Sequence, residues 1–194
     1  AASDVYKRQR INAYGAARGI RILHYINSSG LKEIIEGTEI AHEFRRIYAC
    51  SFLYDIDGVA YWPAVAVNYT NKTQFIFKIN KGVESVFDSK LVNQYIEEDK
   101  RPVPFRRMIY VGDGTTDIPC MRLVKNSGGH SIAVYNPEIR NARRELNGLI
   151  RDNRVSHVCP ADYSEGSEMD TLVKTIIDKI EADHRLELLE TPRT

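Results

Sequence analysis

The segment 110–119, YVGDGTTDIP, contains the residues best suited to do chemistry in this chain. An apolar run leads into Gly112, Asp113 and Gly114, and Asp117 follows. Open α/β sheets bind ligands at the carboxyl ends of their strands, where glycines let the backbone come close to an anion. Mg²⁺ suits such a place, because it keeps several waters and takes one or two protein carboxylates beside a phosphate. The pattern therefore predicts that Asp113 and Asp117 face one cleft and bind a metal ion.

The same loop also has a structural interpretation. At a strand-turn-helix junction, Asp117 would only complement the positive end of the helix dipole. An isolated GDG triplet would favour that interpretation. The whole GDGxxD pattern behind an apolar strand favours the ligand site instead.

Ser28 is a second candidate, because it stands between an apolar run and a helical pattern. A serine in this place usually caps the helix by accepting an amide hydrogen bond. The free amides of a helix N-terminus also bind anions, so the hydroxyl could either cap the helix or contact a phosphate oxygen. Both roles stay open for Ser28, with Ser29 and Gly30 beside it.

Lys72 is a third candidate. Asn71 and Gln74 have the spacing of a capping box, which places Lys72 at the first position of a helix. A cation there costs on the order of 0.3–1 kcal/mol, and a bound anion would offset that cost. Lys78 and Lys81 lie further along the same helix and are interpreted as solvated charges.

The elements that must position these residues follow an α/β pattern, because short apolar runs alternate with amphipathic helical stretches. Buried strands are predicted at residues 20–27, 107–114, 130–136 and 155–162. Helices are predicted from Ser28 or Ser29 to Gly37, at 116–129, from Pro137, and from near Ser167. The sequence therefore predicts a parallel sheet flanked by helices.

Residues 46–68 interrupt this alternation with two extended runs around the acidic turn Asp55-Ile56-Asp57-Gly58. The pattern predicts an inserted β-hairpin in which Gly58 supplies the positive φ. An acid-x-acid pair after an apolar strand can also be a phosphatase nucleophile, but its loop should lead into a helix whose amides face the phosphate. An extended run follows here, so the hairpin is preferred. Asp55 as an out-of-order nucleophile is the alternative.

Composition predicts one soluble, cytoplasmic domain. The 194 residues are 43% hydrophobic and 27% charged, with a net charge of +1. The basic residues are scattered and no apolar run has the length of a membrane span, so neither nucleic acid nor a membrane is expected as a partner. Cys50, Cys120 and Cys159 are far apart and odd in number, which favours reduced thiols. A leader of residues 1–12, expected to be disordered or non-native, precedes a core domain of residues 13–190.

Three motifs in this order resemble those of the haloacid-dehalogenase-like (HAD) phosphatases, and the phosphoserine-phosphatase branch is the most similar. GDGTTD is similar to the fourth motif of the family, HYINSSGL at 24–31 to the second, and VNYTNKTQFIF at 67–77 to the third. That branch also places a β-hairpin between its second and third motifs, where 46–68 lies. The resemblance covers about residues 15–180.

The resemblance implies a Rossmann-like HAD core and Mg²⁺-dependent hydrolysis of a small phosphorylated metabolite, for which phosphoserine is one candidate. It implies that residues 28–30 and Lys72 bind the phosphate and that Asp113 and Asp117 bind the metal. Lys72 and Asp117 would be catalytic. In this family Mg²⁺ and the lysine offset the negative charge on the phosphoryl group.

In the family, an Asp on the first, central strand attacks phosphorus, and a second Asp two residues later protonates the leaving oxygen. Residues 1–27 contain no Asp-x-Asp pair, and Asp4 stands alone. The resemblance therefore implies that the central first strand, expected between the strands that end at Ser28 and Asp113, is missing. This chain would then be the carboxyl-terminal part of a phosphatase and inactive alone. The alternative is a non-catalytic HAD-like module that binds phosphate or a partner.

Overall fold

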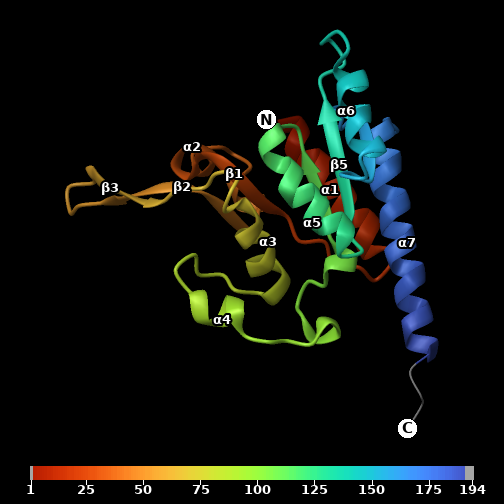
Figure 1. Cartoon of the computed structure of the whole chain (residues 1–194), viewed down its shortest axis with the longest axis horizontal. Helices are drawn as coiled ribbons and strands as arrows, with labels where there is room; N and C mark the ends of the chain where they lie inside the picture. The colour runs from red at the N-terminus through yellow and green to blue at the C-terminus, as the bar shows by residue number, and fades with distance from the viewer. Residues whose placement is uncertain (1, 191–194) are drawn as a thin grey trace.

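The computed structural model describes residues 2–190, with side chains from residue 9 onward, and its strands form two separate sheets (Figure 1). The first sheet has the order β1-β2-β3, with β1 and β2 parallel and β2 and β3 antiparallel. The second has the order β4-β5-β6 and is entirely parallel. The strands are β1 (Tyr25–Leu31), β2 (Arg46–Tyr54), β3 (Ala60–Val65), β4 (Ile109–Gly112), β5 (His130–Tyr135) and β6 (His157–Pro160).

Helices alternate with these strands and flank them. They are α1 (Ala2–Ala16), α2 (Lys32–Glu36), α3 (Lys72–Lys81), α4 (Ser89–Asn93), α5 (Ile118–Asn126), α6 (Ala142–Arg151) and α7 (Glu168–Glu190). Short 3₁₀ turns lie at Ala41–Glu43, Glu98–Lys100, Phe105–Arg107 and Thr115–Asp117. The chain is therefore a mixed α/β protein with parallel strands flanked by helices, as the sequence predicts. No helix among the described residues has the length and apolar character needed to cross a membrane.

The second sheet is covered on both faces. Alternate residues of a strand point to opposite faces. In β5, Ile132 and Val134 pack with Met169 of α7, while Ala133 packs with Met121 of α5. It follows that α7 covers one face of this sheet and α5 the other.

The two sheets are joined by side chains rather than by strand pairing. One buried cluster contains Tyr48 of β2, Phe75 and Ile76 of α3, and Val124 of α5. Helix α3 contacts both β1 and α5, so it bridges the two halves. The halves therefore share a core although their strands do not share a sheet.

The β2–β3 hairpin projects from the body of the molecule (Figure 1). Its turn is the acidic segment, in which Oδ1 of Asp55 accepts the amides of Asp57 (3.0 Å) and Val59 (2.8 Å), and Gly58 has a φ of 78°. The acidic segment is therefore the turn of a β-hairpin, in agreement with the preferred interpretation of the sequence. Several large apolar side chains on the hairpin are exposed, among them Ile56, Tyr61 and Trp62.

Two predicted helix starts are wrong. Helix α2 begins after Leu31 without a serine cap, because the Ser28 hydroxyl accepts the Gly30 amide at 3.0 Å instead. The helix predicted from Pro137 begins only at Ala142. The Asn136 side chain accepts the amide two residues later, and that turn replaces the first helical residues. The strand predicted at 20–27 also starts late, because pairing with β2 begins at Tyr25.

The leader and two lysines also differ from expectation. The predicted disorder of the leader is wrong for residues 2–12, because they are helical within α1. Lys78 is buried, donates to the carbonyls of Ser85 and Asp88, and has its pKa lowered by burial. Lys81 also donates to backbone carbonyls. These lysines are not solvated charges, because the chain after α3 folds back and brings its carbonyls to them.

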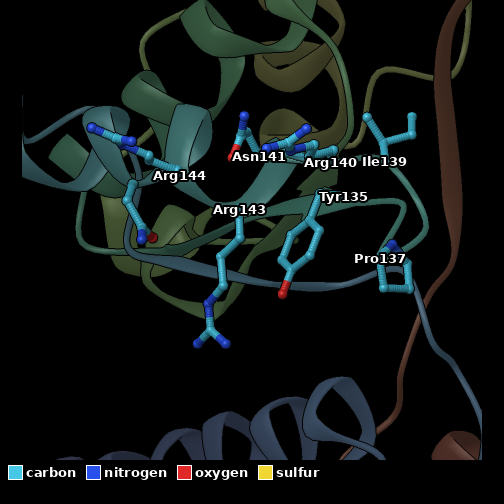
Figure 2. Close-up of a pocket in the computed structure, with 9 residues that line it drawn as sticks. Tyr135, Pro137, Ile139, Arg140, Asn141, Arg143 and Arg144 are labelled. Atoms are coloured by element: carbon cyan, nitrogen blue, oxygen red, sulfur yellow. The ribbon is translucent and has the colours of Figure 1, made fainter.

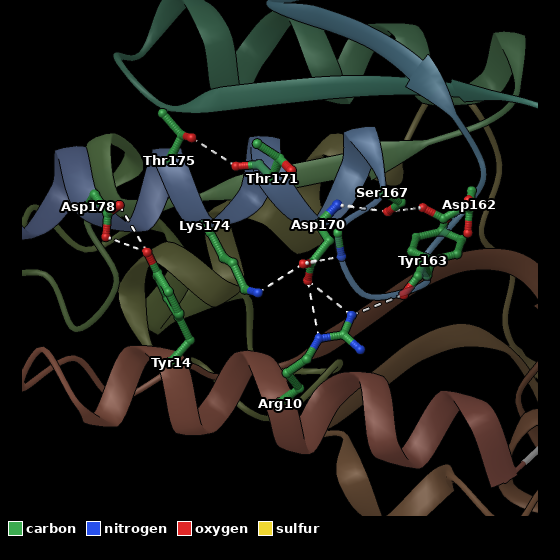
Figure 3. A network of polar contacts seen from close by, with 11 residues as sticks. Arg10, Tyr14, Asp162, Tyr163, Ser167, Asp170, Thr171, Lys174, Thr175 and Asp178 are labelled. Atoms are coloured by element: carbon green, nitrogen blue, oxygen red, sulfur yellow. Dashed lines mark hydrogen bonds and ion pairs between the residues drawn. The ribbon is translucent and has the colours of Figure 1, made fainter.

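Helix α1 is held against α7 by a polar network around Asp170 (Figure 3). Arg10 Nη2 lies 3.0 Å from Oδ1 of Asp170, and Lys174 Nζ lies 2.9 Å from Oδ2. The Asp170 side chain is only 2% exposed. Further along, the Tyr14 hydroxyl donates to Asp178 at 2.9 Å. Because Arg10 meets Asp170 and Tyr14 meets Asp178, α1 and α7 run in the same direction.

We expect Asp170→Asn to lower the free energy of unfolding by on the order of 2 kcal/mol, because a neutral amide no longer balances Arg10 and Lys174. Burial tends to raise the pKa of Asp170, but hydrogen bonds from Lys174, the Gly166 amide and Arg10 outweigh burial and lower it. Stability from this carboxylate is present above the pKa of an unfolded aspartate. It is lost as the pH falls through the lowered folded-state value.

Urea unfolding followed by circular dichroism measures this effect. The difference between the wild type and Asp170→Asn should be largest at neutral pH and should shrink in acid. Asp178→Asn is the matched control, because its side chain is 49% exposed and its loss should cost less than about 1 kcal/mol. Equal losses for the two variants would contradict the central role of Asp170.

Candidate functional site

A buried ion pair joins the two halves of the molecule. Nζ of Lys72, the first residue of α3, lies 2.5 Å from Oδ1 of Asp117. The two side chains are 6% and 10% exposed. Breaking such a pair costs about 3–5 kcal/mol, because the remaining charge is left buried without its partner. Two of the residues predicted from the sequence are therefore in direct contact.

Asn27 of β1 fixes the start of α3. Its Nδ2 donates to the carbonyl of Lys72 at 3.1 Å. The predicted capping box is absent, because the Asn71 side chain accepts the Asn68 amide and donates to the Ala66 carbonyl. Lys72 nevertheless occupies the first helical position, as predicted. It does so because the turn before it is held by the hydrogen bonds of the Asn71 side chain, and because Asn27 of β1 binds the carbonyl of Lys72 itself.

Gly112, the last residue of β4, allows Asp117 to sit over the end of the strand. A Cβ at position 112 would lie 2.6 Å from Cβ of Asp117 and 2.8 Å from its Cγ. Gly114 is less restricted, because the nearest atom to a Cβ there is 3.7 Å away. The Gly114 amide also donates weakly to Oδ2 of Asp117, at 3.4 Å. The first glycine of GDG is therefore required for close packing, whereas a Cβ at the second would make only ordinary van der Waals contacts.

Tyr110 completes the surroundings of Asp117. Its hydroxyl donates to Oδ1 of Asp117 at 2.7 Å. Burial, together with neighbouring Cys120 and Asp117, raises the pKa of Tyr110, so the hydroxyl stays protonated and able to donate. Burial also raises the pKa of Cys120 to about 11, so this thiol is not a thiolate near neutral pH. The Oδ1 atom of Asp117 therefore accepts from an ammonium and a hydroxyl at once.

The remaining predicted residues are close in the sequence to Asn27 and Gly112, which contact the ion pair. Asp113 follows the last residue of β4, and it is exposed. Ser28 follows Asn27 on β1 and is half-buried, while Ser29 and Gly30 are exposed. In the part of the chain that the structure describes, no group of three or more His, Cys, Asp or Glu side chains is arranged to hold a metal ion. Asp113 is thus the accessible carboxylate of the loop, and Asp117 is the buried one.

A groove of about 630 Å³ separates β1 from β4. Tyr25 and Asn27 line it from β1, and Ile109 and Val111 line it from β4. Within residues 2–190, β1 pairs only with β2 and β4 only with β5. Each of the two strands therefore turns an unpaired edge toward the groove.

A second hollow lies at the carboxyl end of β5 and is lined by three arginines (Figure 2). Figure 2 shows the Arg143 side chain pointing the same way as Tyr135, while Arg144 points elsewhere. Nη2 of Arg143 also lies 3.9 Å from Oε1 of Glu168, and all three arginines are exposed. Side chains that diverge in this way do not define one anion site, and this hollow is not part of the candidate site.

Sequence reasoning missed Asn27, Tyr110 and Cys120. Alternation along β4 could have found Tyr110, because Tyr110 and Gly112 share one face of the strand and Asp117 sits over Gly112. Asn27 carries the only side-chain amide in the run 20–27, which was a weaker signal. The sequence around Cys120 did not indicate a place in the site, because its neighbours are simply apolar.

We expect Gly112→Ala to displace Asp117 and to lower the free energy of unfolding by about 1–3 kcal/mol, as overpacking does in tight sites. Gly114→Ala is the matched control, since its backbone is extended and a methyl group there would come no closer than 3.7 Å to another atom. Thermal and urea unfolding of both variants test the difference. If the two alanines cost the same, Asp117 does not need the space above Gly112.

Comparisons with known proteins identify a relative of this chain but do not show a family to which it belongs. No protein-family model matches the chain, and no solved structure matches it. An uncharacterized protein of Borreliella burgdorferi is 29% identical over 177 residues, which cover 80% of this chain. The chain spans only 56% of the length of that relative.

Proposed function

We propose that this chain supplies the phosphate- and metal-binding part of a magnesium-dependent phosphomonoester hydrolase of the HAD type. The observation that carries the proposal is the buried Lys72–Asp117 pair at the carboxyl edge of β4. A lysine ammonium held there by one carboxylate keeps further N–H donors for a phosphate oxygen. The three motifs that resemble the family thus include two residues that meet in space.

Each residue has a role under this proposal. Lys72 would bind the phosphoryl group, with Asp117 and Asn27 holding it in place. The exposed carboxylate of Asp113 suits Mg²⁺, which needs only one or two protein carboxylates because water fills its other positions. Mg²⁺ would supply positive charge to the phosphate oxygens. Ser28 and the backbone of residues 28–30 would contact the phosphate from the β1 side.

The nucleophile is expected from polypeptide outside this chain. Asp117 is occupied by Lys72 and Tyr110, and Asp55 lies in the projecting hairpin turn with two amides on its carboxylate. The complete protein would act through an aspartyl-phosphate on a small phosphorylated metabolite. This chain alone would bind phosphate without turnover.

A non-catalytic module is the second candidate. One observation favours it: Asp117 already accepts hydrogen bonds from Lys72, Tyr110 and Gly114, so its carboxylate is satisfied without a ligand. Such a pair could serve only to hold the two halves of the molecule together. Mg²⁺-dependent phosphate binding distinguishes the proposed function from a module in which the ion pair is only structural.

Calorimetric titration of inorganic phosphate, with and without Mg²⁺, tests the proposal. Wild type should bind phosphate in a Mg²⁺-dependent way, and Asp113→Asn should weaken binding about tenfold or more by removing the carboxylate that suits the metal. Asp57→Asn in the hairpin turn is the matched control and should bind like wild type. Absence of Mg²⁺-dependent phosphate binding in wild type would leave the ion pair as a structural feature.

Activity provides a separate test. The purified chain with Mg²⁺ should not hydrolyse a generic aryl phosphate. Turnover that Asp113→Asn abolishes would place the nucleophile within this chain. Trapping with beryllofluoride and mapping the modified aspartate would then show whether Asp55 is that nucleophile.

A further inference from the structure

We propose that the tip of the β2–β3 hairpin docks into the arginine-lined hollow of a second copy of this chain. The tip consists of residues 55–58, and the hollow is the one at the carboxyl end of β5. This proposal goes beyond the proposed function, because it involves neither Lys72 nor Asp117. The shape of the hairpin, the charges of the two surfaces and their places in the molecule support it.

The two long edges of the hairpin are not suited to pair with another strand. Within residues 2–190, β3 pairs only with β2, and it contains Pro63. A proline has no N–H group, and prolines on edge strands hinder pairing with a further strand. On the other edge, beyond the end of β1, the Phe52 amide donates to Oε1 of Glu33 at 2.9 Å. A partner of the hairpin must therefore contact its turn or its faces.

The turn and both faces of the hairpin expose apolar side chains. Successive residues of a strand point to opposite faces, so the Leu53–Trp62 pair lies on one face and the Phe52–Pro63 pair on the other. Leu53 and Trp62 are 41% and 61% exposed, and Ile56 in the turn is 100% exposed. Large exposed apolar patches on a protein mark interaction sites. The hairpin therefore has the surface of a docking element.

The tip is acidic, and its conformation is fixed in advance. Oδ1 of Asp55 accepts the amides of Asp57 and Val59, which holds the turn in one shape. A loop that is already ordered loses little conformational entropy when it binds. Residues 51–65 contain no basic side chain, and their two charged residues are Asp55 and Asp57. The tip thus presents Ile56 between two carboxylates.

The hollow has the complementary chemistry. Its volume is about 480 Å³, and Tyr135 and Ile139 line it together with Arg140, Arg143 and Arg144. Ile139 is 61% exposed, which gives Ile56 of a docked tip an apolar neighbour. Arg143 and Arg144 point in different directions (Figure 2), so they suit two carboxylates on either side of a loop better than a single anion. Opposite charges on two surfaces favour their encounter and fix their orientation.

The tip and the hollow of one chain lie far from each other. Figure 1 shows the hairpin projecting from the left side of the molecule, while α6 lies at the upper right. The contact must therefore join two copies, and each copy has one tip and one hollow. Such head-to-tail contacts produce a closed ring or an open row of copies. Because Gly112 of β4 pairs with Ala133 of β5, a tip docked at the end of β5 would lie at the same edge of the sheet as Asp113.

Sedimentation velocity of the purified chain tests the proposal. A loop in a hollow is a small interface, so the measurement should cover protein concentrations from roughly 10 µM to 1 mM. The average mass of the wild type should rise with concentration and exceed that of a dimer. Two variants with exposed substitutions each remove one surface. The tip variant carries Ile56→Ser and Asp57→Asn, and the hollow variant carries Arg140→Gln, Arg143→Gln and Arg144→Gln. Each should associate at least about tenfold more weakly than the wild type.

A mixture of the two variants is the most specific measurement. The hollow variant keeps its tip, and the tip variant keeps its hollow. An equimolar mixture should therefore form one-to-one complexes and nothing larger. The matched control is Glu97→Gln with Glu98→Gln, which neutralises two exposed carboxylates outside both surfaces and should associate like the wild type. Circular dichroism confirms that each variant is folded.

Three results would overturn the proposal. The first is a wild type that stays monomeric over the whole concentration range. The second is a hollow variant that associates like the wild type, as it would if two hairpins paired with each other. The third is a mixture of folded variants without one-to-one complexes. Sedimentation needs neither phosphate nor Mg²⁺, so this result and the result of the phosphate titration are independent.

Discussion

The contact between Lys72 and Asp117 is the interaction on which the arrangement of the site depends. Lys72 belongs to the half built on β1 and β2, and Asp117 to the half built on β4, β5 and β6. Buried ion pairs add little net stability compared with apolar packing, yet breaking one is costly, so they act mainly on geometry. The pair therefore fixes how the two halves meet at the edge where ligands of open sheets bind.

Much of the fold could be predicted from periodicity. The apolar runs that became β4, β5 and β6 are strong local signals, and the acidic turn with Gly58 indicated its hairpin. Helix α7 is indicated by apolar residues spaced three and four apart, which are Met169, Leu172, Val173, Ile176, Ile177 and Ile180. The errors arose where side chains compete with the backbone. The Ser28 hydroxyl accepts the Gly30 amide instead of capping α2, and the Asn136 turn displaces the start of α6. Helix α1 was missed because its partner, Asp170, lies far away in the sequence.

The candidate site was predictable in part. Residue type and spacing identified Lys72 and Asp117, since both signals lie within single local motifs. Their contact could not be predicted from spacing alone, because it depends on the packing of α3 against α5. The burial of Lys78 was missed for the same reason, since its partners are carbonyls of a loop with no regular pattern. The packing of elements that are distant in the sequence determines which polar residues are in contact. The local sequence shows only which residue types could form such a contact.

The position of Trp62 has a practical consequence. It is the single tryptophan of the chain, and it lies 61% exposed on β3, in the projecting hairpin. An indole that is already largely in water changes its emission little when the core melts, whereas it changes strongly when something covers it. The intrinsic fluorescence of this protein would therefore report contacts made by the hairpin. Its emission would change little when the packed interior unfolds.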